Sequence, residues 1–398
     1  MMKRFGALIL GIALASCARV PGPNIVPAGP GVAPIARLDG ASGYKTIFSF
    51  DGADGSDPDS VLLSVKGELY GATSGGGDWS TGGGTVFALT PGGQERVLHS
   101  FGQGADGRGP AGDLLFLNGT LYGMTTYGGK YDQGTVFSIN AMQQEHVLHS
   151  FGKGSDGKQP MGGLTLLNGM LYGTTSEGGT EYGGGTVFRI SSAGVERVIY
   201  NFDAREGGDS PRAGLTAVKG LLYGTTSDGS SCDDGTAFSM TTTGKEHVLH
   251  TFSCYSDGSG PFAKLIVVKD TLYGTTFEGG TGQYYSGTVF SLTLDGKERV
   301  IHIFGKGNDG EYPDSSLVAV NGTLFGVTHE GGTNGKGVVY SLTQSGTERI
   351  LHNFGPPPDG DDPRAGLLHL NGVLYGTAGG GGKSFYGDGT VFKISPTE

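Results

Sequence analysis

Residues 164–202 read LTLLNGMLYGTTSEGGTEYGGGTVFRISSAGVERVIYNF, and this stretch decides the fold. It contains four short runs rich in β-branched and aromatic residues, separated by turn residues, which is the pattern of four consecutive strands. We name the expected strands A to D in chain order. The stretch has no 3.6-residue apolar period, which excludes a helical repeat.

The same unit is repeated seven times between Tyr44 and Glu398. Its marker is Gly-Thr-Val-Phe or a close variant, and successive markers are 50, 51, 50, 52, 50 and 52 residues apart. The marker glycines are Gly84, Gly134, Gly185, Gly235, Gly287, Gly337 and Gly389. Four antiparallel strands in a period near 50 residues are typical of a β-propeller blade of the kelch or quinoprotein kind. The sequence therefore predicts an all-β, seven-bladed β-propeller.

The phase of the repeat at its two ends predicts how the ring closes. The repeat region begins with a D-type strand, residues 44–50 (YKTIFSF), and ends with a C-type strand, residues 390–395 (TVFKIS). We expect the first strand to complete the last blade, because this pairing leaves no open sheet edge.

The link between strands A and B is two residues long, as at Asn168-Gly169. Asn-Gly accepts the positive φ angles of a type I′ turn, so a tight hairpin is expected here. Asn118-Gly119-Thr120 also matches a glycosylation sequon, but the turn explains the same residues. Antiparallel order then places the long B–C and D–A connections together on the opposite face of the propeller.

Residues 1–16 have the pattern of a signal peptide, with Lys3 and Arg4 before an apolar run that is too short to cross a bilayer. Leu14-Ala15-Ser16-Cys17 resembles the bacterial lipobox, so we expect lipidation of Cys17 after cleavage. The alternative is a plain secretory signal cleaved near Ala15 or Ser16. An exported protein at the outer membrane or cell surface is predicted, or otherwise a periplasmic or secreted one.

Residues 17–43 are rich in Pro, Gly and Ala and have no apolar period, which indicates a tether between the lipidated cysteine and the propeller. The chain that follows the signal peptide has 25 basic and 38 acidic residues, a net charge of −13. Nucleic acids and anionic membrane surfaces are therefore poor partners, and membrane contact is expected only through the lipid anchor. We expect a monomer that needs no cofactor.

The repeat unit resembles the GloVer tandem repeat of exported bacterial proteins, whose anchoring device varies from member to member. Three stretches carry the resemblance: LYGTTSEGG at 171–179, GTVF at 185–188 and VLHSF at 147–151. The resemblance covers residues 44–398. It implies the repeat architecture and export, and it names no substrate.

A binding site is expected on the face that carries the B–C and D–A loops, because these loops vary most between repeats. They contain aromatic residues for stacking on sugar rings and acids for bonding sugar hydroxyls. The alternative is that the aromatics pack over glycine-rich backbone between blades. The candidate binding residues are Trp79, Tyr127, Tyr131, Glu177, Tyr182, Asp228, Glu278, Tyr284, Tyr285, Glu330 and Tyr386.

Metal binding is not expected. Asp-Gly pairs such as Asp106-Gly107 lack the acidic ladder of an EF-hand and are interpreted as turns. Histidines recur at one position of strand D, where Tyr200 and Phe48 replace them, so an aromatic-sized filler explains the position. Cys232 and Cys254 lie in loops of one blade on the same face. A disulfide is expected between them in an exported protein, the alternative being two free thiols.

No nucleophile and base stand out from the sevenfold pattern, so no catalytic residue is assigned. The leading hypothesis is a non-enzymatic binding scaffold for a glycan or a protein. The alternative is a carbohydrate-active enzyme, a glycoside hydrolase or lyase, that uses acids on the long-loop face. An assembly role in outer-membrane machinery is a third possibility.

Overall fold

The computed structural model describes residues 43–78, 82–180, 183–203, 208–229, 234–253, 256–281 and 285–396. They belong to one unit, 41–398, and all of their regular structure is β-strand. Within these ranges no helix is long and apolar enough to cross a membrane.

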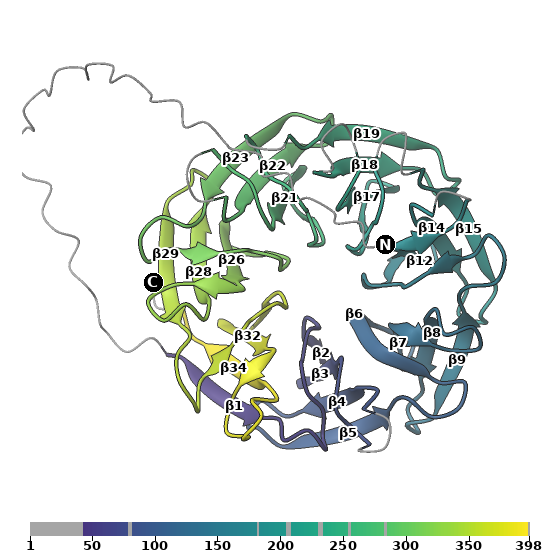
Figure 1. Ribbon diagram of the computed structural model, residues 1–398, viewed down its shortest axis with the longest axis horizontal. Coiled ribbons are helices and arrows are strands. Elements are labelled where there is room, and N and C mark those ends of the chain that lie inside the picture. The colour runs from purple at the N-terminus through teal and green to yellow at the C-terminus, as the bar shows by residue number, and fades with distance from the viewer. Residues whose placement is uncertain are drawn as a thin grey trace, which may run out of the picture. The chain divides into compact units, whose positions relative to one another are not determined.

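Seven four-stranded antiparallel sheets are arranged in a ring, which confirms the predicted seven-bladed propeller (Figure 1). In six sheets the strand order follows the chain, with A innermost and D outermost, and in the seventh the D strand is supplied by the N-terminal β1. The A strands are β2 (Leu63–Val65), β6 (Gly107–Leu117), β11 (Thr165–Leu167), β16 (Thr216–Val218), β20 (Ile266–Val268), β25 (Val318–Val320) and β31 (Leu368–Leu370). The B strands are β3 (Glu68–Thr73), β7 (Thr120–Gly128), β12 (Met170–Thr175), β17 (Leu221–Thr226), β21 (Thr271–Thr276), β26 (Thr323–Thr328) and β32 (Val373–Ala378).

The outer half of each blade carries the marker and the strand that follows it. The C strands are β4 (Thr85–Leu89), β8 (Thr135–Ile139), β14 (Thr186–Ile190), β18 (Thr236–Met240), β22 (Thr288–Thr293), β28 (Val338–Thr343) and β34 (Thr390–Ile394). The D strands are β5 (Glu95–Ser100), β9 (Glu145–Ser150), β15 (Glu196–Asn201), β19 (Glu246–Thr251), β23 (Glu298–Ile303), β29 (Glu348–Asn353) and β1 (Lys45–Ser49).

The N-terminal strand closes the ring, as predicted. β1 pairs antiparallel with β34, with Thr46 opposite Phe392 and Ser49 opposite Thr390. The sheet order β1-β34-β32-β31 makes β1 the outermost strand of the seventh blade. Both ends of the repeat region are therefore joined in one sheet.

The A–B links are tight hairpins with two residues in the left-handed region. Asn168 and Gly169 have φ angles of 51° and 77°, as a type I′ turn requires. Lys219 and Gly220, at 51° and 82°, show that lysine takes the first position equally well in this fold.

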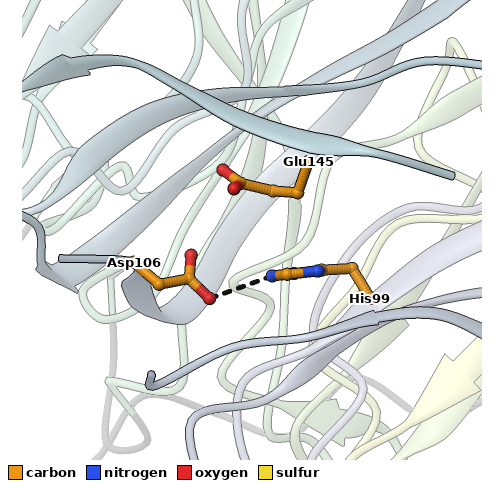
Figure 2. A group of neighbouring side chains, drawn as sticks. All are labelled: His99, Asp106 and Glu145. Atoms are coloured by element: carbon orange, nitrogen blue, oxygen red, sulfur yellow. Dashed lines mark hydrogen bonds and ion pairs between the residues drawn. The ribbon is translucent and has the colours of Figure 1, made fainter. Parts of the chain in front are cut away.

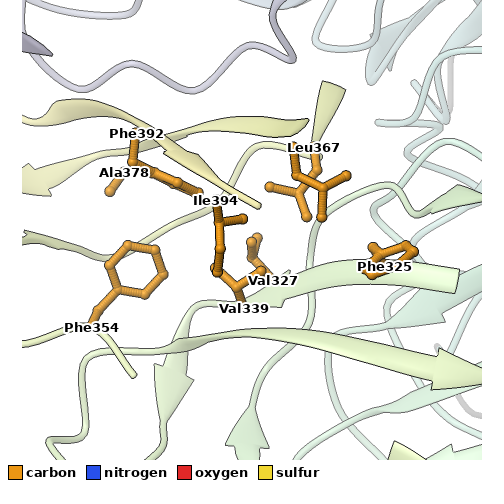
Figure 3. Packing of buried hydrophobic residues seen from close by; sticks show 9 residues of the cluster. Phe325, Val327, Val339, Phe354, Leu367, Ala378, Phe392 and Ile394 are labelled. Atoms are coloured by element: carbon orange, nitrogen blue, oxygen red, sulfur yellow. The ribbon is translucent and has the colours of Figure 1, made fainter. Parts of the chain in front are cut away.

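The hydrophobic core lies between neighbouring blades rather than inside each sheet. A buried aromatic residue on each C strand packs on the phenylalanine that directly follows the D strand of the preceding blade, with ring centroids 4.9 to 5.3 Å apart. Figure 3 shows Phe354 and Phe392 in the cluster between the sixth and seventh blades. A Cβ atom on Gly173 of β12 would lie 2.5 Å from Phe188 Cζ, so the ring needs glycine at this position.

Short two-stranded ladders join the D–A and B–C loops on one face. They are β10 (Gly157–Lys158) with β13 (Glu177–Gly178), β24 (Gly310–Glu311) with β27 (Glu330–Gly331), and β30 (Gly360–Asp361) with β33 (Gly380–Gly381). These ladders stiffen the face on which the sequence predicts binding.

Candidate functional site

A cavity of about 600 Å³ lies where the inner ends of the seven blades meet. Its wall is built mainly from the segments that follow the proline of each D–A loop. The first residue after that proline is one of five residue types in the seven blades, and all seven residues line the cavity: Asp59, Ala111, Met161, Arg212, Phe262, Asp314 and Arg364. The sevenfold pattern is broken here, so this cavity is the candidate site.

Local backbone geometry points these residues to the centre. The residue before the proline is left-handed, as at Tyr312 (φ 59°) and Asp362 (φ 56°). The Tyr312 N–H donates to the Ser286 carbonyl at 2.8 Å, which ties the loop to the preceding blade. The chain therefore reverses direction at the proline and enters the cavity wall.

A half-buried acid, Asp113, and a half-buried lysine, Lys264, line the cavity. Asp113 Oδ1 accepts a hydrogen bond from the Val61 N–H at 3.3 Å. Lys264 Nζ donates to Thr165 Oγ1, also at 3.3 Å, so it reaches from the fifth blade to the third. Burial raises the pKa of Asp113, and the positive charge of Lys264 opposes that rise.

A cluster of four charged side chains lies beside the cavity between the sixth and seventh blades. Asp362 Oδ1 lies 2.9 Å from His329 Nε2 and accepts a hydrogen bond from Arg364 Nε at 2.8 Å. Asp314 completes the cluster, and its buried Oδ1 has no hydrogen-bond partner among the described residues. One carboxylate thus orients the histidine and the arginine, while the other remains available.

The pKa values of the two acids in the cluster shift in opposite directions. Burial raises the pKa of Asp314 to about 7, although His329 and Arg364 oppose the shift. Burial also acts on Asp362, but hydrogen bonds from His329 and Arg364 outweigh it and leave its pKa lowered. The same hydrogen bond to Asp362 raises the pKa of His329. Of the two acids, Asp314 therefore holds its proton to a higher pH than Asp362 does.

A second acid of the cavity wall belongs to the first blade. Asp59 Oδ2 accepts a hydrogen bond from Ser74 Oγ at 3.2 Å. Its side chain is exposed to the cavity, yet the surrounding protein limits the hydration of its charge and raises its pKa to about 6. The nearby Arg364 charge lowers this pKa, so Arg364 acts on both Asp59 and Asp314.

Aromatic rings pack next to the charged cluster, and one of them, Phe262, belongs to the cavity wall. The Phe277 ring lies 5.4 Å from Phe262 and 5.1 Å from Tyr312, measured between ring centroids. Arg212 Cζ lies 5.1 Å from the Phe262 centroid, which is cation–π distance. Phe277 also approaches His329, at 6.3 Å. An apolar surface therefore adjoins charged and hydrogen-bonding groups.

Of the described candidates from the sequence, Tyr127 at the end of β7 lines the cavity, and the others lie elsewhere on the loops. Tyr131 packs against Lys130 at the outer rim, and Tyr386 packs on Phe385 with 84% of its surface exposed. Glu177, Asp228, Glu278 and Glu330 lie on the ladders or bridges that join the loops, and Tyr285 is 45% exposed. The structure does not bring these seven together. Trp79, Tyr182, Tyr284, Cys17, Cys232 and Cys254 lie outside the described residues.

The histidines of strand D do not converge on one another, but each has a partner that the sequence interpretation missed. His99 packs edge-on against Phe101, with centroids 4.6 Å apart, as an aromatic filler does. Its Nε2 also lies 2.9 Å from Asp106 Oδ2 (Figure 2). The missed signal is a constant spacing of seven residues between histidine and aspartate, which holds in five repeats.

The residues at the cavity were also missed, although a signal for them was present in the sequence. The position after the loop proline carries an acid, a base, an aromatic ring or a small residue in different repeats. A position whose residue type varies within a strict repeat is a candidate for function. Glu177 and its counterparts, by contrast, recur in the ladders and bridges that join the loops.

Solved structures share the propeller at low sequence identity. A streptogramin B lyase structure matches with a TM-score of 0.60 and 12% identity, covering 88% of this chain and 96% of that chain. A europium-containing methanol dehydrogenase matches with a TM-score of 0.53 and 10% identity, covering 90% and 94%. A puromycin hydrolase matches with a TM-score of 0.52 and 14% identity, and the match covers 82% of this chain and 51% of the hydrolase. The likeness shows the fold alone.

No curated protein matches this sequence. The model of the Gloeobacter/Verrucomicrobia repeat matches twice, over residues 32–233 and 210–398. The two matches together span the entire propeller, in agreement with the repeat resemblance that the sequence motifs indicated. The chain is therefore a member of the Gloeobacter/Verrucomicrobia repeat family.

Proposed function

We propose that the protein is a glycan-binding propeller that binds its ligand without cleaving it. The proposed site is the part of the central cavity formed by the fifth, sixth and seventh blades. The observation that carries the proposal is Phe262 in the cavity wall with Asp314 and Arg364, backed by the neighbouring rings of Phe277 and Tyr312.

Sugars present an apolar ring face and a rim of hydroxyl groups. An aromatic surface stacks on the first, and charged hydrogen-bonding side chains pair with the second. Phe262 supplies the surface, while Arg364 and Asp314 supply donors and acceptors at its edge. Because such wall residues occur in some blades and not in others, the ligand has one preferred orientation on an otherwise sevenfold scaffold.

The proposal includes export and attachment to a membrane through Cys17, with residues 17–43 as a tether. Two or more acyl chains hold a protein stably on a membrane. The Cys17→Ser variant should move from the membrane fraction to the soluble fraction. Unchanged fractionation of this variant would refute the lipid anchor and leave the glycan site untested by that result.

Binding is tested with the full chain on a glycan array, followed by calorimetry with the best ligand. Phe262→Ala should raise Kd about tenfold or more, since Phe262 lines the cavity and a central aromatic contact contributes about 1–3 kcal/mol. Phe385→Ala is the matched control, because Phe385 is a loop aromatic that is 94% exposed and lies outside the cavity wall. Equal losses in both variants, or capture of proteins without any glycan, would overturn the proposal.

A second candidate function is glycoside cleavage at the same site, and the observation that favours it is Asp314. A half-buried carboxyl group with a pKa of about 7 has the property required of a general acid at neutral pH. Reducing-sugar release from the bound glycan, abolished by Asp314→Asn, would establish this function. Binding with no product after prolonged incubation supports the non-enzymatic function.

A further inference from the structure

A histidine, an aspartate and a glutamate meet at several boundaries between neighbouring blades. The histidine and the glutamate lie on outermost strands, away from the central cavity. His99, Asp106 and Glu145 form one such triad, and His149, Asp156 and Glu196 form the next. His250, Asp257 and Glu298, and then His302, Asp309 and Glu348, repeat the arrangement. In each triad the possible ligand atoms all lie within 4.8 Å of one another. We propose that each of these triads binds a divalent metal ion of the zinc type.

Two members of each triad come from one blade and are already oriented. His99 is on β5, and Asp106 is in the loop that follows it; their Nε2 and Oδ2 atoms are 2.9 Å apart. The Gly107 N–H donates to Asp106 Oδ1 at 2.7 Å, so the other carboxylate oxygen is held toward the histidine. Such outer hydrogen bonds are the usual means of orienting a metal ligand.

The third member comes from the next blade. Glu145 begins β9, and its buried Oε1 atom has no hydrogen-bond partner among the described residues. The corresponding Oε1 atoms of Glu196, Glu298 and Glu348 share this property, and so does that of Glu95, which faces no histidine–aspartate pair. Figure 2 shows the Glu145 carboxylate next to the His99–Asp106 pair. Placing a second carboxylate here without a partner costs free energy that a cation would recover.

The triads are accessible from the outer surface. His149, Asp156 and Glu196 line a rim cavity of about 580 Å³. His302, Asp309 and Glu348 line another of about 360 Å³. An ion can therefore enter, and water can complete its coordination, as in open zinc sites with three protein ligands.

The donor set selects the class of metal. One imidazole nitrogen and two carboxylate oxygens suit zinc, whereas calcium takes six to eight oxygen ligands. Ligand atoms around a tetrahedral zinc are about 3.5 Å apart, so small side-chain rotations suffice. The ion would displace the proton between histidine and aspartate, and zinc uptake would release protons to the buffer.

The other boundaries provide matched controls within the same chain. Phe48 and Tyr200 take the histidine position at two of them, opposite Glu95 and Glu246. At the closing boundary Tyr44 takes the glutamate position and stacks on His352, with ring centroids 3.6 Å apart. These boundaries have the same fold but lack the complete donor set, so none of them should bind the ion.

The experiment is calorimetric titration of the full chain with zinc chloride at pH 7.4, after EDTA treatment and desalting. The wild type should bind about four ions with similar affinity, and the quadruple variant E145Q/E196Q/E298Q/E348Q should lose these sites. The double variant E95Q/E246Q should bind as the wild type does. The single variant E145Q, which leaves three triads intact, should lose one site in four.

Cobalt(II) absorption provides a readout that a purely structural role would not change. Intense visible bands are expected in the wild type and in E95Q/E246Q, and their loss is expected in the quadruple variant. Zinc stoichiometry that is equal in the quadruple variant and the wild type would overturn the proposal. The absence of zinc binding in the wild type would also overturn it.

Discussion

His329 Nε2 lies 2.9 Å from Asp362 Oδ1, and the contact joins the sixth blade to the seventh beside the central cavity. Asp362 also accepts a hydrogen bond from Arg364, so one carboxylate sets the position of both cationic groups. The contact lies at the boundary between two blades beside the central cavity. Its removal should alter the charge of the His329 and Arg364 side chains' surroundings.

Asp362→Asn should lower the pKa of His329, because the hydrogen bond to Asp362 is the largest cause of its raised value. The pKa is measured by NMR titration of the histidine ring protons. Glu330→Gln is the control, since Glu330 Oε1 is 3.9 Å from His329 Nε2 and its side chain is 53% exposed. A larger effect from Glu330→Gln than from Asp362→Asn would contradict the assigned hydrogen bond.

Stability should fall as the pH rises from about 5 to about 8 in the presence of EDTA. Burial raises the pKa of Glu95, Glu145, Glu196 and Glu298 from 4.5 to about 7. A raised carboxyl pKa stabilises the folded state fully below the unfolded pKa, and the contribution is lost as the pH rises through the folded pKa. With screening by solvent, we expect about 1 kcal/mol for each glutamate.

Urea unfolding at pH 5 and pH 8 measures this dependence. Glu145→Gln should reduce the difference between the two pH values, whereas Glu177→Gln, on an exposed loop ladder, should leave it unchanged. A wild-type protein that is more stable at pH 8 than at pH 5 would show that other titratable groups dominate the pH dependence of its stability.

Tyr340→Phe should raise the free energy of unfolding by about 1 kcal/mol. Tyr340 is fully buried on β28, and its hydroxyl has no hydrogen-bond partner among the described residues. Phenylalanine occupies the equivalent position in the other blades, as at Phe290. The reciprocal change Phe290→Tyr should destabilise the protein by about 1–3 kcal/mol, and a gain in stability there would refute the explanation.

Phe50→Ala should destabilise the propeller by about 3–5 kcal/mol, because it removes a buried ring at the point of ring closure. Phe50 is 1% exposed and packs on Phe87 with centroids 5.2 Å apart. Phe385→Ala removes the same atoms from a side chain that is 94% exposed and should cost less than about 0.5 kcal/mol. Denaturant unfolding of both variants tests the difference, and similar losses would argue against closure by the first strand.

The repeat alone was sufficient to predict the seven blades, the type I′ hairpins and the pairing of residues 44–50 with the last blade. These features follow from the local sequence pattern and from the phase of the repeat, because the strand runs, the two-residue turn and the GTVF marker or its close variant recur at the same place in successive units. Pairing of the first strand with the last follows from the same phase, since a blade with three strands would leave an open edge.

The tertiary structure decided which residues meet. Asp59, Asp314 and Arg364 are 50 to 305 residues apart in the chain, and only ring closure brings them to one cavity. In the same way, Glu145 reaches His99 and Asp106 because neighbouring blades pack face to face, a contact that no spacing within one repeat contains. A periodic sequence determines the form of each blade, whereas the sites depend on non-periodic residues and on contacts between blades.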